Sequence, residues 1–224
     1  MPLLTKEIKD RIISRQTRQA EILRAQKIIQ ASETLQNRQL IEAWAIIGKA
    51  NMWEKEAEKC EQAYLHCLDI IIVLQDNILL SECYEDLGFA LYFCRQYNKA
   101  LAYYERAADI AQQFRDPQQL CIIYSQMAKC CADLGLMEQE RTYLSQGIDL
   151  PIDPLIKATM LERVSISYAN SSQYREAAKH YEEALSIFEH NNFKRFWEDR
   201  VKSLIEIYRA LGDEDAVQRT IKRK

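Results

Sequence analysis

The sequence has little glycine and proline, the residues that mark turns between strands. Only five glycines and four prolines occur among 224 residues, and no segment alternates β-branched and polar residues as a half-buried strand does. Helix-forming residues are abundant instead. The composition therefore excludes a mainly β fold and predicts an all-α protein.

Long hydrophobic runs are also absent. Apolar runs such as Ile70–Leu74 are far shorter than the roughly 18 residues that a membrane-spanning helix needs. The N-terminal residues MPLLTKEIKD lack the basic region and apolar block of a secretory signal. We expect no membrane insertion and an intracellular, cytoplasmic location; a protein exported by a dedicated effector secretion system would have the same features.

Motifs that carry chemistry are missing. The seven cysteines are odd in number and show no CxxC spacing, which argues against a disulfide framework or a zinc site. Glycine-rich phosphate loops, HExxH and GxSxG do not occur. The net charge of −3 and the lack of a continuous basic stripe argue against nucleic-acid binding. We therefore expect no catalytic residues, no metal, no cofactor and no enzymatic activity.

Residues 1–37 carry an excess of positive charge. The segment has seven basic and four acidic side chains, and its isoleucines and leucines form a loose apolar face. This pattern predicts an N-terminal amphipathic basic helix. Two interpretations stay open: a cap that shields the first unit of a repeat array, or a segment that docks on a partner.

Residues 81–116 show an ordered pattern of large, small and aromatic residues that describes two antiparallel helices. Gly88 falls where the two helix axes approach closely, and Tyr84 and Tyr104 fill the groove between neighbouring hairpins. The same offsets fit again from residues 41, 121, 158 and 198, so that successive units begin 40, 40, 37 and 40 residues apart.

This pattern resembles the tetratricopeptide repeat family in an extended form of about 40 residues. The resemblance covers residues 38–224 and implies a right-handed α-α superhelix, or solenoid, of helical hairpins. It also implies that the first helix of each unit lines a concave groove in which partners bind. The candidate partner-binding residues in this groove are Lys49, Glu82, Glu85, Phe89, Tyr92, Lys129, Glu162, Lys202 and Arg209.

Phe89 and Tyr92 form the groove patch with the most binding potential. Glu82 and Glu85 flank them, Lys129 and Glu162 are expected to face them, and these charges are predicted to be unpaired. Aromatic rings supply much of the energy of peptide recognition, and the carboxylates would prefer a partner that carries Arg or Lys. Alternatively, both aromatic rings pack against helices of the array itself.

Chaperone-binding members of the family hold a C-terminal carboxylate with lysine, asparagine and arginine at fixed groove offsets. Here those offsets carry Ala45 and Lys49, then Asp86, then Ile122 and Gln126. The carboxylate clamp is not present, and we expect no chaperone-tail binding.

The resemblance implies a non-catalytic interaction scaffold or adaptor that binds a peptide or helix of a partner protein in its groove. A peptide-responsive regulatory sensor is the first alternative, although 37 residues are too few for a helix-turn-helix output domain. A structural subunit, docked through its N-terminal helix and convex face, is the second.

Overall fold

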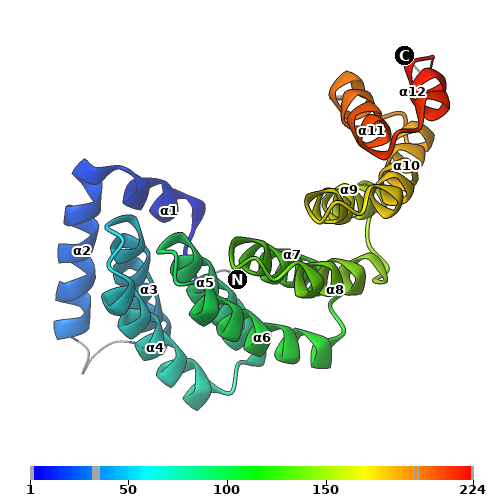
Figure 1. Cartoon of the computed structure of the whole chain (residues 1–224). Coiled ribbons are helices and arrows are strands. Elements are labelled where there is room, and N and C mark those ends of the chain that lie inside the picture. The colour runs from blue at the N-terminus through cyan, green and yellow to red at the C-terminus, as the bar shows by residue number, and fades with distance from the viewer. Residues whose placement is uncertain (1–2, 32–35, 194, 196, 223–224) are drawn as a thin grey trace. The chain divides into compact units, whose positions relative to one another are not determined.

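The computed structural model describes residues 3–31, 36–193, 195 and 197–222 (Figure 1). Within these residues all regular secondary structure is helical, so the predicted all-α helical repeat fold is confirmed. The chain divides into two compact units, Met1–Cys130 (unit 1) and Cys131–Lys224 (unit 2).

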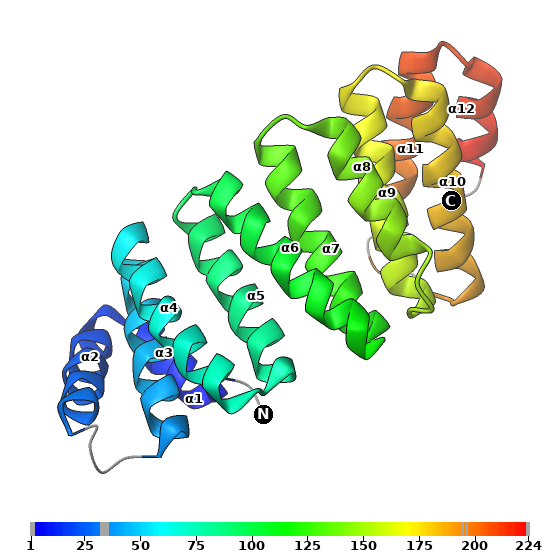
Figure 2. The ribbon, with the colours of Figure 1, turned by 90° about the horizontal axis from the view of Figure 1, so that it is seen from below.

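The helices of unit 1 are α1 (Lys6–Ile13), α2 (Arg15–Gln30), α3 (Asn37–Trp53), α4 (Ala57–Leu74), α5 (Asn77–Phe93), α6 (Tyr97–Phe114) and most of α7 (Pro117–Asp133). Those of unit 2 are α8 (Met137–Ile148), α9 (Pro154–Asn170), α10 (Tyr174–His190), α11 (Trp197–Leu211) and α12 (Glu214–Ile221). In unit 1, α3 packs on α4 and α5 packs on α6 as antiparallel pairs (Figure 2). In unit 2, α9 with α10 and α11 with α12 form the corresponding pairs.

The turns inside the hairpins recur at a fixed spacing. Each such turn contains one residue with positive φ: Lys55 (60°), Arg95 (61°), Gly135 (74°), Ser172 (59°) and Gly212 (80°). Their spacings of 40, 40, 37 and 40 residues equal those of the predicted units. The left-handed conformation ends the first helix so that the chain can reverse into the second.

Two glycines allow the helices of a hairpin to approach closely. A Cβ atom placed on Gly48 would lie 2.6 Å from the ring of Tyr64, and one on Gly88 would lie 2.9 Å from the ring of Tyr104. Both tyrosines are fully buried. The predicted role of Gly88 as a site of close approach thus has a direct structural basis, because the aromatic ring occupies the space that a methyl group would need.

The hydroxyl group of Tyr104 is buried and has no hydrogen-bond partner within the described part of the chain. Burial of an unpaired hydroxyl costs free energy. We therefore expect Tyr104→Phe to raise the free energy of unfolding by about 1 kcal/mol, measured by urea denaturation. Tyr103→Phe is the matched control and should not stabilise, because the Tyr103 hydroxyl donates to Glu61 Oε1 at 2.9 Å. A loss of stability in Tyr104→Phe equal to that in Tyr103→Phe would contradict this prediction.

The third unit is shorter than the others because its second helix is short. Helix α8 has 12 residues, whereas α4 and α6 have 18 each. The segment between α8 and α9 contains Pro151 and Pro154, and Asp153 begins α9 by accepting a hydrogen bond from Leu155 N at 2.8 Å. This shortening accounts for the spacing of 37 residues.

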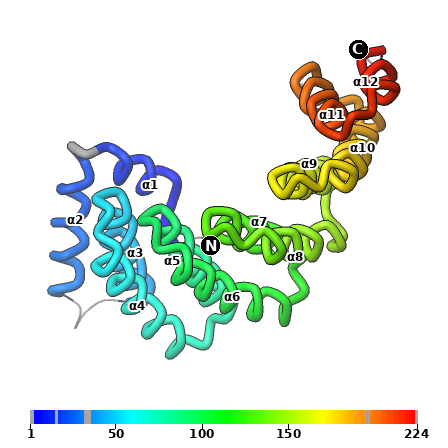
Figure 3. The backbone as a smooth tube through the Cα atoms, in the orientation of Figure 1, coloured from blue at the N-terminus to red at the C-terminus, as the bar shows by residue number. Residues whose placement is uncertain are grey.

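The N-terminal segment contains two helices where the sequence predicted one; residues 1–2 and 32–35 of that segment lie outside the described residues. Ser14 has an extended backbone (φ −70°, ψ 124°) that ends α1 and begins α2. The break is stabilised by Arg18, which donates to Ile12 O at 2.7 Å and to Ile13 O at 2.9 Å. The guanidinium group thus satisfies carbonyl groups at the C-terminal end of α1. Both α1 and α2 pack against α3 (Figure 3).

All seven cysteines are free, and all except Cys94 are buried. Burial raises the pKa of Cys60 to about 12, which disfavours the reactive thiolate. The buried thiols therefore pack as small apolar groups.

Candidate functional site

The groove face of the first hairpin is covered. Ala45 and Met52 share the face of α3 that carries Lys49, and their exposed fractions are 0% and 1%. On α7, by contrast, Ile122 is 47% exposed and Lys129 is also exposed. The difference arises because α1 and α2 pack against α3.

Phe89 lies at the centre of the candidate site in unit 1. Its ring is half-buried on α5, and Lys49 Nζ from α3 lies 4.9 Å from the ring centroid, within the range of a cation–π interaction. Lys49 Nζ is also 3.9 Å from Asp86 Oδ1. Burial lowers the pKa of Lys49, while Asp86 acts in the opposite direction. The groove therefore holds an aromatic ring next to a lysine that already has partners.

Two carboxylates border this ring. Burial, reinforced by the neighbouring Asp86, raises the pKa of Glu85 to about 7, although a hydrogen bond from Gln119 Nε2 opposes the shift. Burial also raises the pKa of Glu82. A carboxylate that is poorly solvated gains more from an approaching cation than an exposed one does. These two side chains thus form an acidic border that a basic partner residue would stabilise.

The raised pKa of Glu85 predicts a pH effect on stability. The native protein holds this proton more tightly than the unfolded chain, so the contribution of Glu85 is favourable at low pH and is lost as the pH rises through about 7. Glu85→Gln removes this titrating group. When the pH rises from about 5 to about 8, the unfolding free energy of the variant should therefore increase by on the order of 1–2 kcal/mol relative to that of the wild type. Urea denaturation at both pH values measures this gain. Glu58→Gln, which alters an exposed carboxylate, is the control, and an equal gain in that variant would refute the assignment to Glu85.

Tyr92 and Lys129 complete the predicted residues of unit 1. The Tyr92 ring packs against Tyr97 with centroids 5.5 Å apart, so one of the two predicted aromatic side chains is engaged by the array itself. Lys129 donates to Gln126 Oε1 at 3.1 Å on the exposed face of α7. The sequence did not anticipate these internal partners.

A cavity of about 300 Å³ adjoins Glu82. It is lined by Ile78, Ser81, Glu82, Ala111, Phe114, Asp116 and Gln119, which belong to α5, α6 and the start of α7. Ile78 and Phe114 are 63% and 48% exposed. This part of unit 1 thus offers apolar surface beside a carboxylate.

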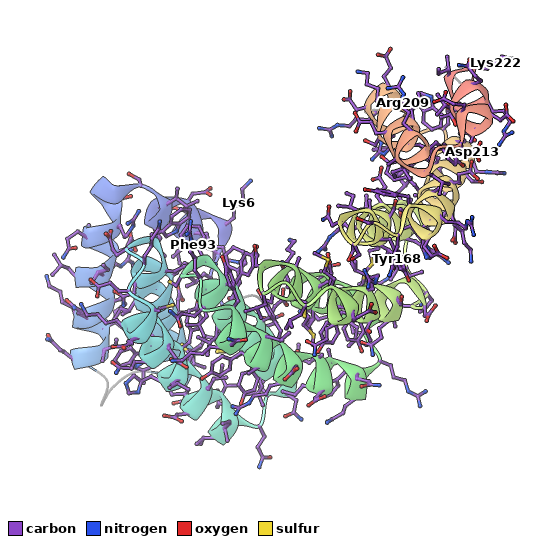
Figure 4. The ribbon with its side chains drawn as sticks, in the orientation of Figure 1. Lys6, Phe93, Tyr168, Arg209, Asp213 and Lys222 are labelled. Carbon is purple, nitrogen blue, oxygen red and sulfur yellow. The ribbon has the colours of Figure 1, made fainter. Side chains whose placement is uncertain are left out.

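The remaining predicted residues lie in unit 2. Glu162 accepts from Arg200 Nε at 2.7 Å, and both side chains are largely buried, so the prediction of an unpaired charge at Glu162 is wrong. Lys202 Nζ lies 3.2 Å from Asp199 Oδ1 at the surface. Arg209 is exposed near the end of α11, and Figure 4 marks it together with Asp213 in the turn that follows. Glu162 therefore has a structural partner on α11.

Sequence reasoning missed Gln119 and the N-terminal helix as parts of the site. Gln119 lies just before the third unit, outside the groove offsets, and its Nε2 donates to Glu85 on α5. The positive charge of Lys9 on α1 acts to lower the pKa of both Lys49 and Glu85. No pattern within residues 1–37 indicated on which groove positions this segment would pack.

Within the described residues, no group of three or more histidine, cysteine, aspartate or glutamate side chains could hold a metal ion. His66 stacks on Trp44 with centroids 4.2 Å apart, and His180 stacks on Tyr168 at 5.4 Å. Across the residues that the structure covers, no helix is both long and apolar enough to cross a membrane.

Comparison with known proteins identifies the repeat. The tetratricopeptide repeat family matches residues 80–113, which include most of α5 and nearly all of α6. No curated protein matches the chain in sequence. The predicted repeat type is therefore confirmed on the hairpin that carries the clearest pattern.

Solved structures show the same fold at low sequence identity. RapI in its apo form has a TM-score of 0.75 and 16% identity, over 88% of this chain and 56% of RapI. BtubC (BKLC) from P. vanneervenii has a TM-score of 0.70 and 18% identity, over 98% of this chain and 90% of BtubC. A Rap protein complexed with Competence and Sporulation Factor has a TM-score of 0.55 and 19% identity, over 88% of this chain and 56% of that protein. The chain thus spans little more than half the length of the two Rap proteins.

These findings define the class: the protein is an all-helical repeat protein of the tetratricopeptide type.

Proposed function

We propose that the protein is a non-catalytic interaction scaffold that binds a peptide or helix of a partner protein in the groove formed by α3, α5 and α7 of unit 1. The observation that carries this proposal is the half-buried ring of Phe89 beside the poorly solvated carboxylates Glu82 and Glu85. An apolar partner side chain would bury the ring, and a lysine or arginine next to it would pair with the carboxylates.

The exposure of α7 supports the same site. Ile122 and Lys129 lie on its groove face and are open to solvent. Together with Phe89 on α5 they extend the surface across neighbouring hairpins, as an extended peptide or a helix would require. The proposed partner segment is therefore amphipathic and carries positive charge.

A peptide-display selection tests the proposal. Random 16-residue peptides are selected on the full chain, and the affinity of each enriched peptide is then measured by calorimetry for the wild type and for Phe89→Ala/Tyr92→Ala. We expect enriched peptides to combine apolar and basic residues and to bind the double variant at least about tenfold more weakly, since a lost aromatic anchor costs roughly 2 kcal/mol. Val73→Ala is the control, because Val73 is 78% exposed on α4, outside the groove and the adjoining cavity. Equal losses in both variants, or none in either, would overturn the proposal.

A regulatory sensor is the second candidate. The likeness in fold to a Rap protein complexed with Competence and Sporulation Factor favours it. In a sensor, a bound peptide changes the conformation of the chain, whereas a simple scaffold keeps it. Small-angle scattering of the chain with and without a selected peptide separates the two: a change in radius of gyration supports the sensor, and an unchanged radius supports the scaffold.

A further inference from the structure

The first helix has the features of a bound ligand rather than of a repeat helix. Leu4, Ile8 and Ile12 recur every four residues and are 2%, 9% and 0% exposed. Leu3 beside them is 4% exposed, whereas Lys6 on the opposite face is exposed and projects away from the neighbouring helices of unit 1 (Figure 4). This short segment is therefore amphipathic and basic, which is the chemistry expected of a partner.

The segment lies on the proposed groove. Helix α1 packs against α3, and Figures 1 and 2 both show it crossing α3 from the side of α5. Lys9, half-buried on α1, acts electrostatically on Lys49 of α3 and on Glu85 of α5. These are two of the predicted groove residues. The covered positions Ala45 and Met52 belong to the same face of α3.

Two arginines hold this segment in place. Arg18 at the start of α2 donates to the carbonyl groups of Ile12 and Ile13, pairs with Glu54 at the end of α3, and lies 5.9 Å from the ring centroid of Trp53.

The second arginine is Arg11 of α1, whose Nε lies 3.1 Å from Oε1 of Glu21 on α2. The attachment of α1 is therefore a few buried apolar side chains and the polar contacts of these two arginines.

Helix α1 depends on this docking for its order. It has eight residues, which is too short for a stable isolated helix in water. The extended residue Ser14 separates it from α2, so α1 can leave α3 without unwinding α2. Segments of this kind open at lower cost than the core of the fold.

We infer that the groove of unit 1 is a docking site for a basic amphipathic helix, and that residues 3–13 are its intramolecular occupant, which a partner helix of the same pattern displaces. This inference rests on the proposed function and adds the partner class and a means of regulation. The acidic groove residue Glu85 matches Lys9 of α1, which lowers its pKa. Occupation by α1 lowers the apparent affinity for a partner until α1 is released.

The test uses a synthetic peptide with the sequence of residues 3–14 and three forms of the full chain: wild type, Ile12→Asp and Ile13→Asp. Ile12 is fully buried, whereas its neighbour Ile13 is 51% exposed, so the two variants add the same charge to the same helix. We expect Ile12→Asp to release α1 and to bind the peptide at least tenfold more tightly than the other two forms. Equal affinities in all three forms would overturn the inference.

Hydrogen exchange on the wild type provides a test that does not require a variant. The amides of α1 should exchange faster than those of α3, and added peptide should accelerate exchange in α1 further. If α1 is as protected as α3, it is an integral part of the fold and the inference fails, even if Ile12→Asp does not fold.

The two proposals can fail separately. Adding Phe89→Ala/Tyr92→Ala to Ile12→Asp should weaken peptide binding if the aromatic groove is the site. Binding that survives this change contradicts the proposed function but leaves the displacement of α1 standing. Tight binding to the wild type that is lost in Phe89→Ala/Tyr92→Ala contradicts the displacement but supports the proposed function.

Discussion

Replacement of Arg200 by methionine is expected to lower the free energy of unfolding of unit 2 by about 3–5 kcal/mol. The guanidinium group donates to both carboxylate oxygens of Glu162, at 2.7 and 3.4 Å, and lies 3.8 Å from the ring centroid of Phe188. The pair is largely buried, with side chains 11% and 16% exposed. Methionine keeps much of the apolar packing but leaves the Glu162 carboxylate buried without its partner.

The measurement is thermal or urea unfolding followed through Trp197, which lies at the start of α11. Lys202→Met is the matched control on the same helix: its ion pair with Asp199 is exposed, so its loss should cost less than about 1 kcal/mol. Addition of Glu162→Gln to Arg200→Met should recover part of the loss, since a neutral amide is less costly to bury than a carboxylate. A loss in Arg200→Met no larger than that in Lys202→Met would show that the pair does not stabilise unit 2.

Gly88→Val is expected to destabilise unit 1 by about 2–3 kcal/mol. Even one added carbon would lie 2.9 Å from two ring atoms of Tyr104, and this ring is fully buried among helices. The ring cannot move without displacing its own neighbours, because protein interiors are densely packed. The α5–α6 hairpin must therefore open slightly to accommodate the larger side chain.

Urea unfolding, followed through Trp44 and Trp53 of α3 and by circular dichroism, measures this effect. Ala102→Val is the control, because Ala102 is exposed on α6. Valine at this position should lower the free energy of unfolding only by its lower helix propensity, about 0.5 kcal/mol. The double variant Gly88→Val/Tyr104→Leu should lose less than the sum of the two single variants, since the smaller side chain makes room for the valine. Strict additivity would mean that Gly88 and Tyr104 do not limit how closely the helices approach.

The sequence predicted the repeats because each depends on local and nearest-neighbour packing. Gly88 and Tyr104 are 16 positions apart and belong to one hairpin, so their pairing follows from the repeat pattern alone. The positive-φ turns at Arg95 and Gly135 also follow this spacing. In an array whose units contact only their neighbours, the pattern in one unit is sufficient to define its fold.

The partners of charged side chains could not be predicted in the same way. Glu162 was expected to be an open groove residue, but Arg200, 38 positions later, binds it. Glu85 similarly accepts from Gln119, 34 positions later. Long polar side chains have many rotamers and reach across helices. Their pairing therefore depends on the separation and orientation of the helices, which the repeat pattern does not determine.

The sequence by itself determined that this is an all-α protein of tetratricopeptide-type hairpins, because helix propensity and the periodic placement of small and aromatic residues act within one hairpin. Only the tertiary structure decided which groove positions are open. Leu4, Ile8 and Ile12 could have packed on any apolar surface, and their burial on the first hairpin depends on the Ser14 break and on the contacts of Arg18 with α1 and α3. Those contacts join residues that no periodic pattern relates.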